Sequence, residues 1–353
     1  MRPLVRCLIA ALVASCLLCA SADALPRARY GAHSMLYLDS PYALKVAMFR
    51  DARRIGAGWI RLDVAVPEIV ESPTRRNWEA LDEYIRLARR YRLRVSAVLL
   101  GTPWWLAKCP PGTALADTYR CPPADAGTWA GYAAEIAQHA RGTIDTWEIL
   151  NEPDMRGFFT GGPGDYAAML AASYDAIKRA NPSATILAGG VRGLRSRPWL
   201  AEALRASGPH VFDVASVHVR GRADGLASDM GAWRRFFRAR GFTGPLWVTE
   251  HGYPSQARWQ YDRRFRGGSC SQAAYLRFSV PTLLRNGAAK VFVTERDNLT
   301  GRYASEGIIS SRRRRLCAAR RLARLAGSQE AGPKERGRAH ASADQASLRP
   351  PPP

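Results

Sequence analysis

Short continuous runs of apolar residues alternate along the chain with longer stretches in which apolar residues recur at helical spacing. Short apolar runs predict strands at residues 29–32, 58–64, 94–100, 143–150, 185–188, 211–218, 246–250 and 290–294. Between them, amphipathic stretches predict helices at residues 77–91, 128–140, 165–180, 197–206, 226–240 and 271–286. In the first of these helices, Leu81, Tyr84, Ile85 and Ala88 recur at helical spacing. Gly or Pro marks several of the junctions.

This alternation predicts an α/β fold, and the number of strands favours a single-domain (β/α)8 TIM barrel spanning residues 25–327. An open, doubly wound sheet also alternates strands with helices, so the pattern alone does not separate the two. No Gly-x-Gly-x-x-Gly follows the first strand, which disfavours the dinucleotide-binding form of the open sheet.

The two ends of the chain differ from the middle. Arg2 and Arg6 precede an apolar run over 7–20 and the small residues around Ala24, which predicts a secretory signal peptide at 1–24. Cys16 loosely resembles a lipoprotein cleavage site, but the apolar run continues past it. We expect a secreted, periplasmic or cell-surface protein. Residues 312–327 predict a last helix, and the basic, Pro-rich segment 328–353 predicts a disordered tail.

Composition agrees with a large folded core, because 47% of the 353 residues are apolar and 23% are charged. The formal net charge is +22, and 11 basic against 3 acidic residues within 311–353 supply +8 of it. Such a charge attracts nucleic acid, anionic lipid or an acidic polysaccharide. An arginine-rich composition throughout the chain accounts for the same excess without a specific partner, and we favour that simpler interpretation.

Four of the seven cysteines lie beyond the predicted leader, and an even number in an oxidising compartment favours disulfides. Cys109 and Cys121 flank one Pro/Gly-rich loop and are expected to pair, which leaves Cys270 to pair with Cys317. Neither spacing resembles a zinc site, and the six His are scattered. We therefore expect no metal and no cofactor.

Two predicted strands end in acidic residues. Asn151 and Glu152 end the fourth strand, where Pro153 stops the pairing, and Glu250 ends the seventh. Catalytic groups of a barrel project from this end of its strands. Two carboxylates at one barrel mouth suit cleavage of a glycosidic bond, one as proton donor and one as nucleophile. Either Glu alone is equally well explained as a strand end or a helix cap.

An ordered series of motifs resembles clan A glycoside hydrolases, in particular bacterial proteins similar to glycoside hydrolase family 39 and to family 5 cellulase-like enzymes. The resemblance covers about residues 29–325. The motifs are Trp147-Glu-Ile-Leu-Asn-Glu-Pro-Asp154, Tyr174-Asp-Ala-Ile-Lys-Arg-Ala-Asn-Pro182, Gly189-Gly190, Asp213-Val-Ala-Ser-Val-His218, Thr249-Glu250 and Ser305-Glu-Gly307.

The resemblance implies a retaining double displacement, with Glu152 as the acid/base and Glu250 as the nucleophile. It implies that Asn151 binds the sugar 2-hydroxyl, that Arg61 keeps the nucleophile ionised and that His218 lines the same pocket. A guanidinium remains protonated and lowers the pKa of a neighbouring carboxyl, which suits the role implied for Arg61.

Some of these residues also have structural interpretations. Arg61 is equally suited to pair with Glu148, which shares the strand face of Glu152, and the two pairings are compatible. His218 is equally suited to a hydrogen-bonded place in the core. The chain also departs from the family pattern at Leu150, where Trp is common, at Val219-Arg220 and at 293–296, where an aromatic residue is usual. These departures concern the substrate rather than the bond-breaking pair.

Aromatic and basic residues follow several strands. Trp104, Trp105 and Trp259 (with Tyr261) are candidates to stack on sugar rings or to pack long loops. The arginines near the expected rim suit either an acidic sugar or solvent, and these are Arg220, Arg222, Arg258 and Arg296.

The sequence thus favours a secreted retaining glycoside hydrolase acting on a polysaccharide or oligosaccharide, and the arginines near the expected rim suit an acidic one. A carbohydrate-binding barrel without turnover is the alternative. Binding to nucleic acid is not expected, because the leader and the carbohydrate-type mouth both disfavour it.

Overall fold

The computed structural model describes residues 25–296, 305–310 and 314–327. Eight parallel strands pair in the order β5-β4-β3-β2-β1-β8-β7-β6. They are β1 (Tyr30–His33), β2 (Trp59–Ala65), β3 (Arg94–Leu100), β4 (Thr146–Ile149), β5 (Thr185–Ala188), β6 (Ala215–His218), β7 (Leu246–His251) and β8 (Ala288–Thr294). Parallel bridges at Leu187–Val214 and Val191–Val217 join the two outer strands, so the sheet curls into a nearly closed barrel.

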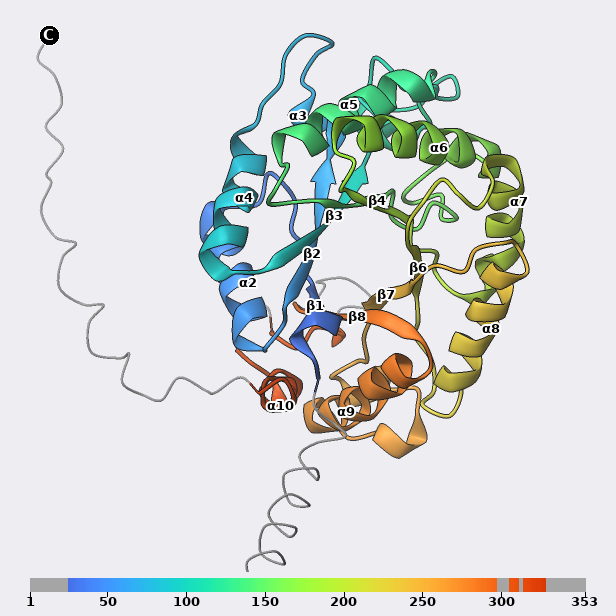
Figure 1. Ribbon diagram of the computed structural model, residues 1–353. Helices are drawn as coiled ribbons and strands as arrows, with labels where there is room; N and C mark the ends of the chain where they lie inside the picture. Colours follow the sequence, from blue (N-terminus) through green and yellow to red (C-terminus); the bar gives the residue numbers. More distant parts are fainter. Residues whose placement is uncertain (1–24, 297–304, 311–313, 328–353) are drawn as a thin grey trace, which may run out of the picture.

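Helices form a ring outside the strands (Figure 1). The α-helices are α2 (Tyr42–Arg54), α3 (Val66–Ile69), α4 (Glu79–Tyr91), α5 (Ala126–His139), α6 (Pro163–Ala180), α7 (Arg197–Ser207), α8 (Leu226–Arg238), α9 (Ser269–Arg285) and α10 (Cys317–Leu325). Short 3-10 helices are η1 (Arg27–Arg29), η2 (Leu115–Arg120), η3 (Leu194–Ser196), η4 (Ala257–Trp259) and η5 (Arg263–Phe265). The fold is the (β/α)8 barrel that the sequence predicts.

All eight predicted strands are present, and 94–100 and 185–188 have the predicted bounds. The sixth strand starts at Ala215 rather than at 211. Before it, the main-chain N–H of Ile186 donates to the Asp213 carboxylate at 2.8 Å and not to a main-chain carbonyl of the neighbouring strand, so regular pairing begins later. Helix α2 was not predicted. Its inner face carries a buried lysine, Lys45, paired at 2.6 Å with Glu83 of α4, and this polar pair interrupts the apolar stripe.

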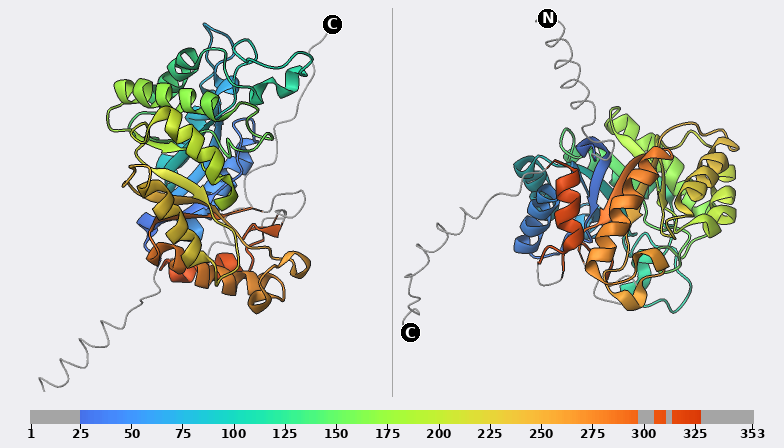
Figure 2. Two further views of the ribbon diagram at one scale, coloured as in Figure 1. Left: turned by 90° about the vertical axis from the view of Figure 1, so that its right-hand side faces the viewer. Right: turned by 90° about the horizontal axis from the view of Figure 1, so that it is seen from below.

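The predicted last helix occupies Cys317–Leu325 and not the whole of 312–327. It packs beside α9, as the view from below shows (Figure 2, right). Cys270 at the start of α9 is bonded to Cys317, and Cys109 is bonded to Cys121, which are the two expected pairs. The predicted leader 1–24 and tail 328–353 lie outside the described residues. No described helix has the length and apolar character needed to cross a membrane.

The barrel interior is filled in layers. At the bottom, the rings of Trp59 and Trp247 meet edge to face at 5.3 Å, and Phe292 packs against both. We call these three rings, of Trp59, Trp247 and Phe292, the aromatic plug. Gly31 of β1 leaves space for the plug, since a Cβ at that position would lie 2.3 Å from Phe292 Cδ1. A polar layer around Arg61 lies next along β2, and the strands then open at their carboxyl ends. The packed bottom therefore confines any cavity to that end.

We expect Gly31→Ala to destabilise the protein by about 1–3 kcal/mol, because the added methyl group overpacks the aromatic plug. Thermal unfolding measures the effect as a lower melting temperature. The matched control is Gly131→Ala on the exposed side of α5, where no atom lies within 4 Å of the added Cβ. A helical Gly-to-Ala change there is neutral or stabilising. Equal melting temperatures for the two variants would contradict this account of the plug.

Candidate active site

A pocket of about 370 Å³ opens at the carboxyl ends of the strands. It is lined by His33, Met35, Tyr37, Arg61, Asp63, Asn151, Glu152, Met155, Phe158, Arg192, Arg220 and Glu250. The polar members come from β1, β2 and β7 and from the loops that follow β4, β5 and β6. Five of the residues proposed from the sequence thus meet in one cavity, namely Arg61, Asn151, Glu152, Arg220 and Glu250.

A sharp turn after β4 presents Asn151 and Glu152 to the pocket. Leu150 and Glu152 both have left-handed backbone angles, with φ of 64° and 41°. Such angles cost a side-chain-bearing residue about 1–3 kcal/mol each, so the surroundings must hold them. The N–H of Leu150 donates to Leu99 at 3.1 Å, and the N–H of Glu152 donates to Gly190 at 2.9 Å. The neighbouring strands therefore fix the turn.

Glu152, Glu250 and His218 converge. One carboxylate oxygen of each Glu and a ring nitrogen of His218 all lie within 4.8 Å of one another. His218 Nδ1 is 2.8 Å from Glu152 Oε1, and its Nε2 is 3.5 Å from Glu250 Oε1. The imidazole therefore lies between the two carboxylates. A register shift at the end of β6 places His218 directly opposite Glu250 of β7.

The Arg61 guanidinium is fully buried and joins four side chains. Its Nε donates to Glu148 at 2.7 Å and its Nη2 donates to the Asn151 amide oxygen at 2.8 Å. Its Nη1 lies 3.2 Å from Glu250 Oε1 and 3.1 Å from His33 Nδ1. Both interpretations of Arg61 from the sequence hold geometrically, because it pairs with Glu148 and with Glu250 together.

Glu148 forms the base of this network. Its second oxygen accepts from the main-chain N–H of Gly190 at 2.8 Å and from the hydroxyl of Ser216 at 3.1 Å. A buried ion pair gives a firm arrangement only when its remaining polar atoms are also bonded. The orientation of Arg61, and through it that of Glu250, is therefore set by a fully engaged carboxylate.

The second oxygen of Glu250 is also bound. Arg220 donates to Glu250 Oε2 at 3.0 Å and to Glu306 at 2.9 Å, so its guanidinium bridges two carboxylates. Burial alone would raise the pKa of Glu250, but His218 and the guanidinium groups of Arg220 and Arg61 hold this pKa well below its usual value. Glu250 is therefore an ionised carboxylate at neutral pH.

His33 also contacts Glu250, at 3.5 Å from its Nε2 to Oε1. Burial lowers the pKa of His33 to about 3, so this imidazole is neutral. His33 is not among the site residues that the sequence predicts, because the predicted first strand ends at residue 32, whereas β1 extends to His33. The signal in the sequence that could have identified His33 is its position at the carboxyl end of a strand.

Two glycines give the site its close packing. A Cβ at Gly190 would lie 2.5 Å from His218 Nε2, and a Cβ at Gly252 would lie 2.5 Å from Glu306 Oε2. Glycine at 190 and 252 thus allows the main chain to approach the groups that hold Glu152 and Arg220.

The tryptophans proposed to stack on sugar do not line this pocket. Trp104 is 62% exposed and packs edge to face with Trp105, which packs on the core. Trp259 lies in η4 with Arg258 over its ring. The aromatic side chains at the pocket are instead Tyr37, from the loop after β1, and Phe158, from the loop after β4. Contact of the three tryptophans with sugar therefore stays a prediction, and Trp105 at least also has the packing role that the sequence left open.

Of the four arginines proposed for the rim, only Arg220 lines the pocket, and Arg192 joins it. Arg222 instead pairs with Asp224 at 3.3 Å, and Arg258 donates to Gln256 at 3.1 Å. Arg296 pairs through its backbone with Ile309.

A buried carboxyl group, that of Glu295, follows the carboxyl end of β8. Glu295 is fully buried and hydrogen-bonded to the Ser34 hydroxyl. Burial raises the pKa of Glu295 well above its usual value. This carboxyl is packed in the interior, and no residue from the end of β8 is among the described residues that line the pocket.

A cation is a conceivable occupant of the site. Glu152, His218 and Glu250 are the one group of three acidic, His or Cys side chains within ligand distance among residues 25–296, 305–310 and 314–327. However, two guanidinium groups already neutralise Glu250 and would repel a metal ion. The chemistry of this donor set fits a proton donor and a nucleophile better than a metal centre.

Asp63 lies on the same face of β2 as Arg61, two residues farther along, and borders the pocket. Burial raises its pKa to about 7, despite the opposing effect of Arg61, and the negative charges of Glu250 and Glu148 add to the rise. Asp63 therefore holds a proton at a pH where surface carboxyls are ionised, and it offers both a donor and an acceptor to the pocket.

The raised pKa of Asp63 makes stability depend on pH. The native state keeps the proton up to about pH 7, whereas the unfolded chain loses it near the usual value of 3.8, so this group costs stability as pH rises from 4 to 7. We expect Asp63→Asn to unfold at a higher temperature than wild type at pH 8 and at nearly the same temperature at pH 4. Asp175→Asn, on an exposed part of α6, corrects for the lost charge. The same difference at both pH values would contradict the raised pKa.

No family model matches the chain, and no curated protein matches it. Among solved structures, a family 39 glycoside hydrolase from Bacteroides cellulosilyticus WH2 is similar, with a TM-score of 0.65 at 17% identity; the match covers 86% of this chain and 64% of that one. This chain thus spans under two thirds of that protein.

Two further structures resemble the chain. A monomeric beta-xylosidase from Caulobacter crescentus CB15 has a TM-score of 0.64 at 15% identity, over 86% of this chain and 69% of that one. A GH5_18 protein from Streptomyces cattleya, in complex with Manβ1-4GlcNAc, has a TM-score of 0.64 at 16% identity, over 86% and 80%. The chain therefore has the barrel fold of glycoside hydrolases of families 39 and 5, the resemblance that its motifs imply.

Proposed function

We propose that the protein is a secreted glycoside hydrolase that cleaves O-glycosidic bonds with retention, through a double displacement. The observation that carries this proposal is the convergence of Glu152 and Glu250, with carboxylate oxygens within 4.8 Å. Retaining enzymes place their two carboxyl groups about 5–5.5 Å apart, whereas inverting enzymes leave room for a water molecule between them. The barrel fold shared with solved glycoside hydrolases agrees with this chemistry.

Glu250 is the nucleophile in this proposal. Its low pKa keeps it ionised, and Arg61 holds one oxygen in place. The other oxygen is held by Arg220, which has Glu306 as a second partner. Attack on the anomeric carbon needs a lone pair, so the bond from Arg220 weakens as the new C–O bond forms. Glu306 keeps that guanidinium paired during the step.

Glu152 is the acid/base. It protonates the leaving oxygen as the glycosyl–enzyme bond forms, and it then takes a proton from the water that breaks this bond. His218 Nδ1, at 2.8 Å, orients the carboxyl. The amide oxygen of Asn151 accepts a hydrogen bond from Arg61, so the NH₂ group of Asn151 remains as a donor to the 2-hydroxyl of a sugar.

The pocket suits a saccharide. Tyr37 and Phe158 offer aromatic faces, and Asp63 and Arg192 offer hydrogen-bonding groups around them. Residues 25–327 form the catalytic barrel of the proposal, preceded by a cleaved leader at 1–24 and followed by the tail at 328–353. The two disulfides suit an oxidising compartment outside the cytosol.

The decisive experiment is covalent trapping. The chain is screened on aryl glycosides, beginning with β-xylosides and β-mannosides because the similar structures name those sugars. It is then treated with the 2-deoxy-2-fluoro glycoside of the best substrate, and the labelled peptide is identified by mass spectrometry. The expected label is on Glu250. Saccharide binding without turnover or labelling would favour the non-catalytic barrel.

We expect Glu250→Ala to lower kcat on the order of 10⁴-fold, because no group remains to form the glycosyl–enzyme bond. Azide fits the space left by the carboxylate, and it should restore turnover and give a glycosyl azide of inverted configuration, detected by NMR. The matched control is Glu202→Ala on the exposed side of α7, which should keep wild-type kcat. Full activity of Glu250→Ala would exclude the assignment.

Glu152→Ala should act differently on the two steps. An aryl glycoside with a very good leaving group needs no proton, so its first step is spared, whereas hydrolysis of the intermediate slows by about 10²–10⁴-fold. Stopped-flow measurement should therefore show a burst of released phenol followed by a slow phase. Azide should accelerate the slow phase and give a product of retained configuration. A variant that loses both phases equally would argue against the acid/base role.

A further inference from the structure

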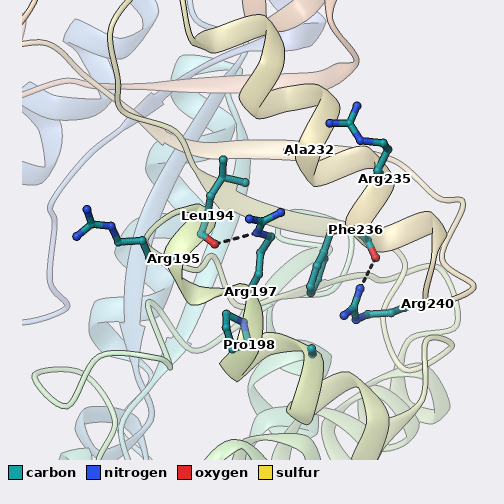
Figure 3. Close-up of a pocket in the computed structure, with 9 residues that line it drawn as sticks. Leu194, Arg195, Arg197, Pro198, Ala232, Arg235, Phe236 and Arg240 are labelled. Carbon is teal, nitrogen blue, oxygen red and sulfur yellow. Dashed lines mark hydrogen bonds between the residues drawn. The ribbon is translucent and has the colours of Figure 1, made fainter.

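A second concave site lies on the outer side of the barrel, between α7 and α8. This groove has a volume of about 650 Å³. Figure 3 shows Arg197 and Phe236 facing one another at its centre, with Arg195 and Arg235 at opposite edges. Arg240 completes the set, and its guanidinium stacks 3.8 Å from the centre of the Phe236 ring.

The groove is strongly cationic. Four arginines line it, and its lining contains no acidic residue. The hydrogen bonds of Arg197 and Arg240 go to main-chain carbonyls, those of Leu194 at 3.0 Å and Phe236 at 2.9 Å. These bonds orient the two guanidinium groups without neutralising them. Within the part of the chain that the structure describes, no carboxylate forms an ion pair with any of the four.

The groove adjoins the active-site pocket. Arg192 lines the pocket, and Leu194 and Arg195, two and three residues later, line the groove. Three residues span at most about 10 Å of extended chain. Asp154 fixes this connecting loop, because it accepts from the Arg192 N–H at 3.4 Å and from the Ser196 hydroxyl at 2.5 Å. Asp154 itself follows Glu152 on the loop after β4.

We propose that this groove binds an anionic polysaccharide, so that an acidic chain occupies it while another part of the same chain reaches the pocket. Guanidinium groups recognise carboxylate and sulfate with paired hydrogen bonds. Pro198, which is exposed, supplies apolar surface for a sugar ring, whereas Phe236 is buried under Arg240 and holds that guanidinium in place. The proposal rests on the proposed function only for the saccharide nature of the ligand; the charge of that ligand follows from the groove itself.

The test compares two charge-matched double variants. Arg195→Ala/Arg235→Ala removes exposed guanidinium groups from the groove. Arg86→Ala/Arg179→Ala removes two exposed ones from α4 and α6 and gives the same net charge. Binding to polygalacturonate and to heparin is measured by isothermal titration calorimetry, with dextran as the neutral polymer. Polygalacturonate tests carboxylate and heparin tests sulfate as the recognised anion.

We expect the groove variant to bind the preferred anionic polymer roughly tenfold more weakly than wild type, and the control variant to bind it as wild type does. Wild-type binding should weaken as salt is added, and dextran should not bind. Equal losses in both variants, or no loss in either, would overturn the proposal, since binding would then reflect overall charge. Tighter binding of single-stranded DNA to the same groove would also overturn it.

The readouts separate this inference from the proposed activity. Because the groove lies outside the pocket, the groove variant should hydrolyse a small aryl glycoside at the wild-type rate. A protein that labels on Glu250 but shows no groove-dependent polymer binding keeps its proposed activity and refutes the groove. Groove-dependent binding without labelling supports the groove and refutes the hydrolase.

Discussion

The Arg61 guanidinium, buried inside the barrel, joins Glu148, Glu250, Asn151 and His33. A charge removed from water in this way is costly unless its hydrogen bonds are satisfied, so its neighbours cannot move independently. Glu148 is held in turn by main-chain and hydroxyl donors. The positions of Glu250 and Asn151 in the pocket therefore depend on this one cation.

The aromatic plug lies directly beneath the hydrogen-bond network of Arg61 and supports it. Trp59 and Arg61 are two residues apart on β2 and point to the same side, so the plug and the ion network are successive layers of one interior. The plug excludes water from one end of the barrel and leaves the charges a single opening. Desolvation on that closed side strengthens the attraction between Arg61 and the carboxylates.

The charges around the pocket are arranged differently from those on the groove. In the pocket, Arg220 is paired with Glu250 and Glu306, so its charge serves to hold carboxylates. In the groove, Arg197 and Arg240 bond only to carbonyls there, and their charge remains available to a ligand. Arginines therefore hold carboxylates in the pocket and remain unneutralised in the groove, a difference that the net charge of the chain does not show.

The sequence by itself determined the order of strands and helices, the Cys109–Cys121 pair and the strand ends that carry Glu152 and Glu250, because these follow from local periodicity and from residues near one another in the chain. The number of strands favoured the barrel without excluding an open sheet, and the Cys270–Cys317 pair followed only by elimination. The tertiary structure alone decided which side chains meet. Three features depend on packing between distant segments: the register shift that sets His218 opposite Glu250, the bond from Arg220 to Glu306, and the presence of Tyr37 and Phe158 at the pocket. Periodicity carries no information about such contacts, since a one-residue shift in register redirects a side chain to the opposite face.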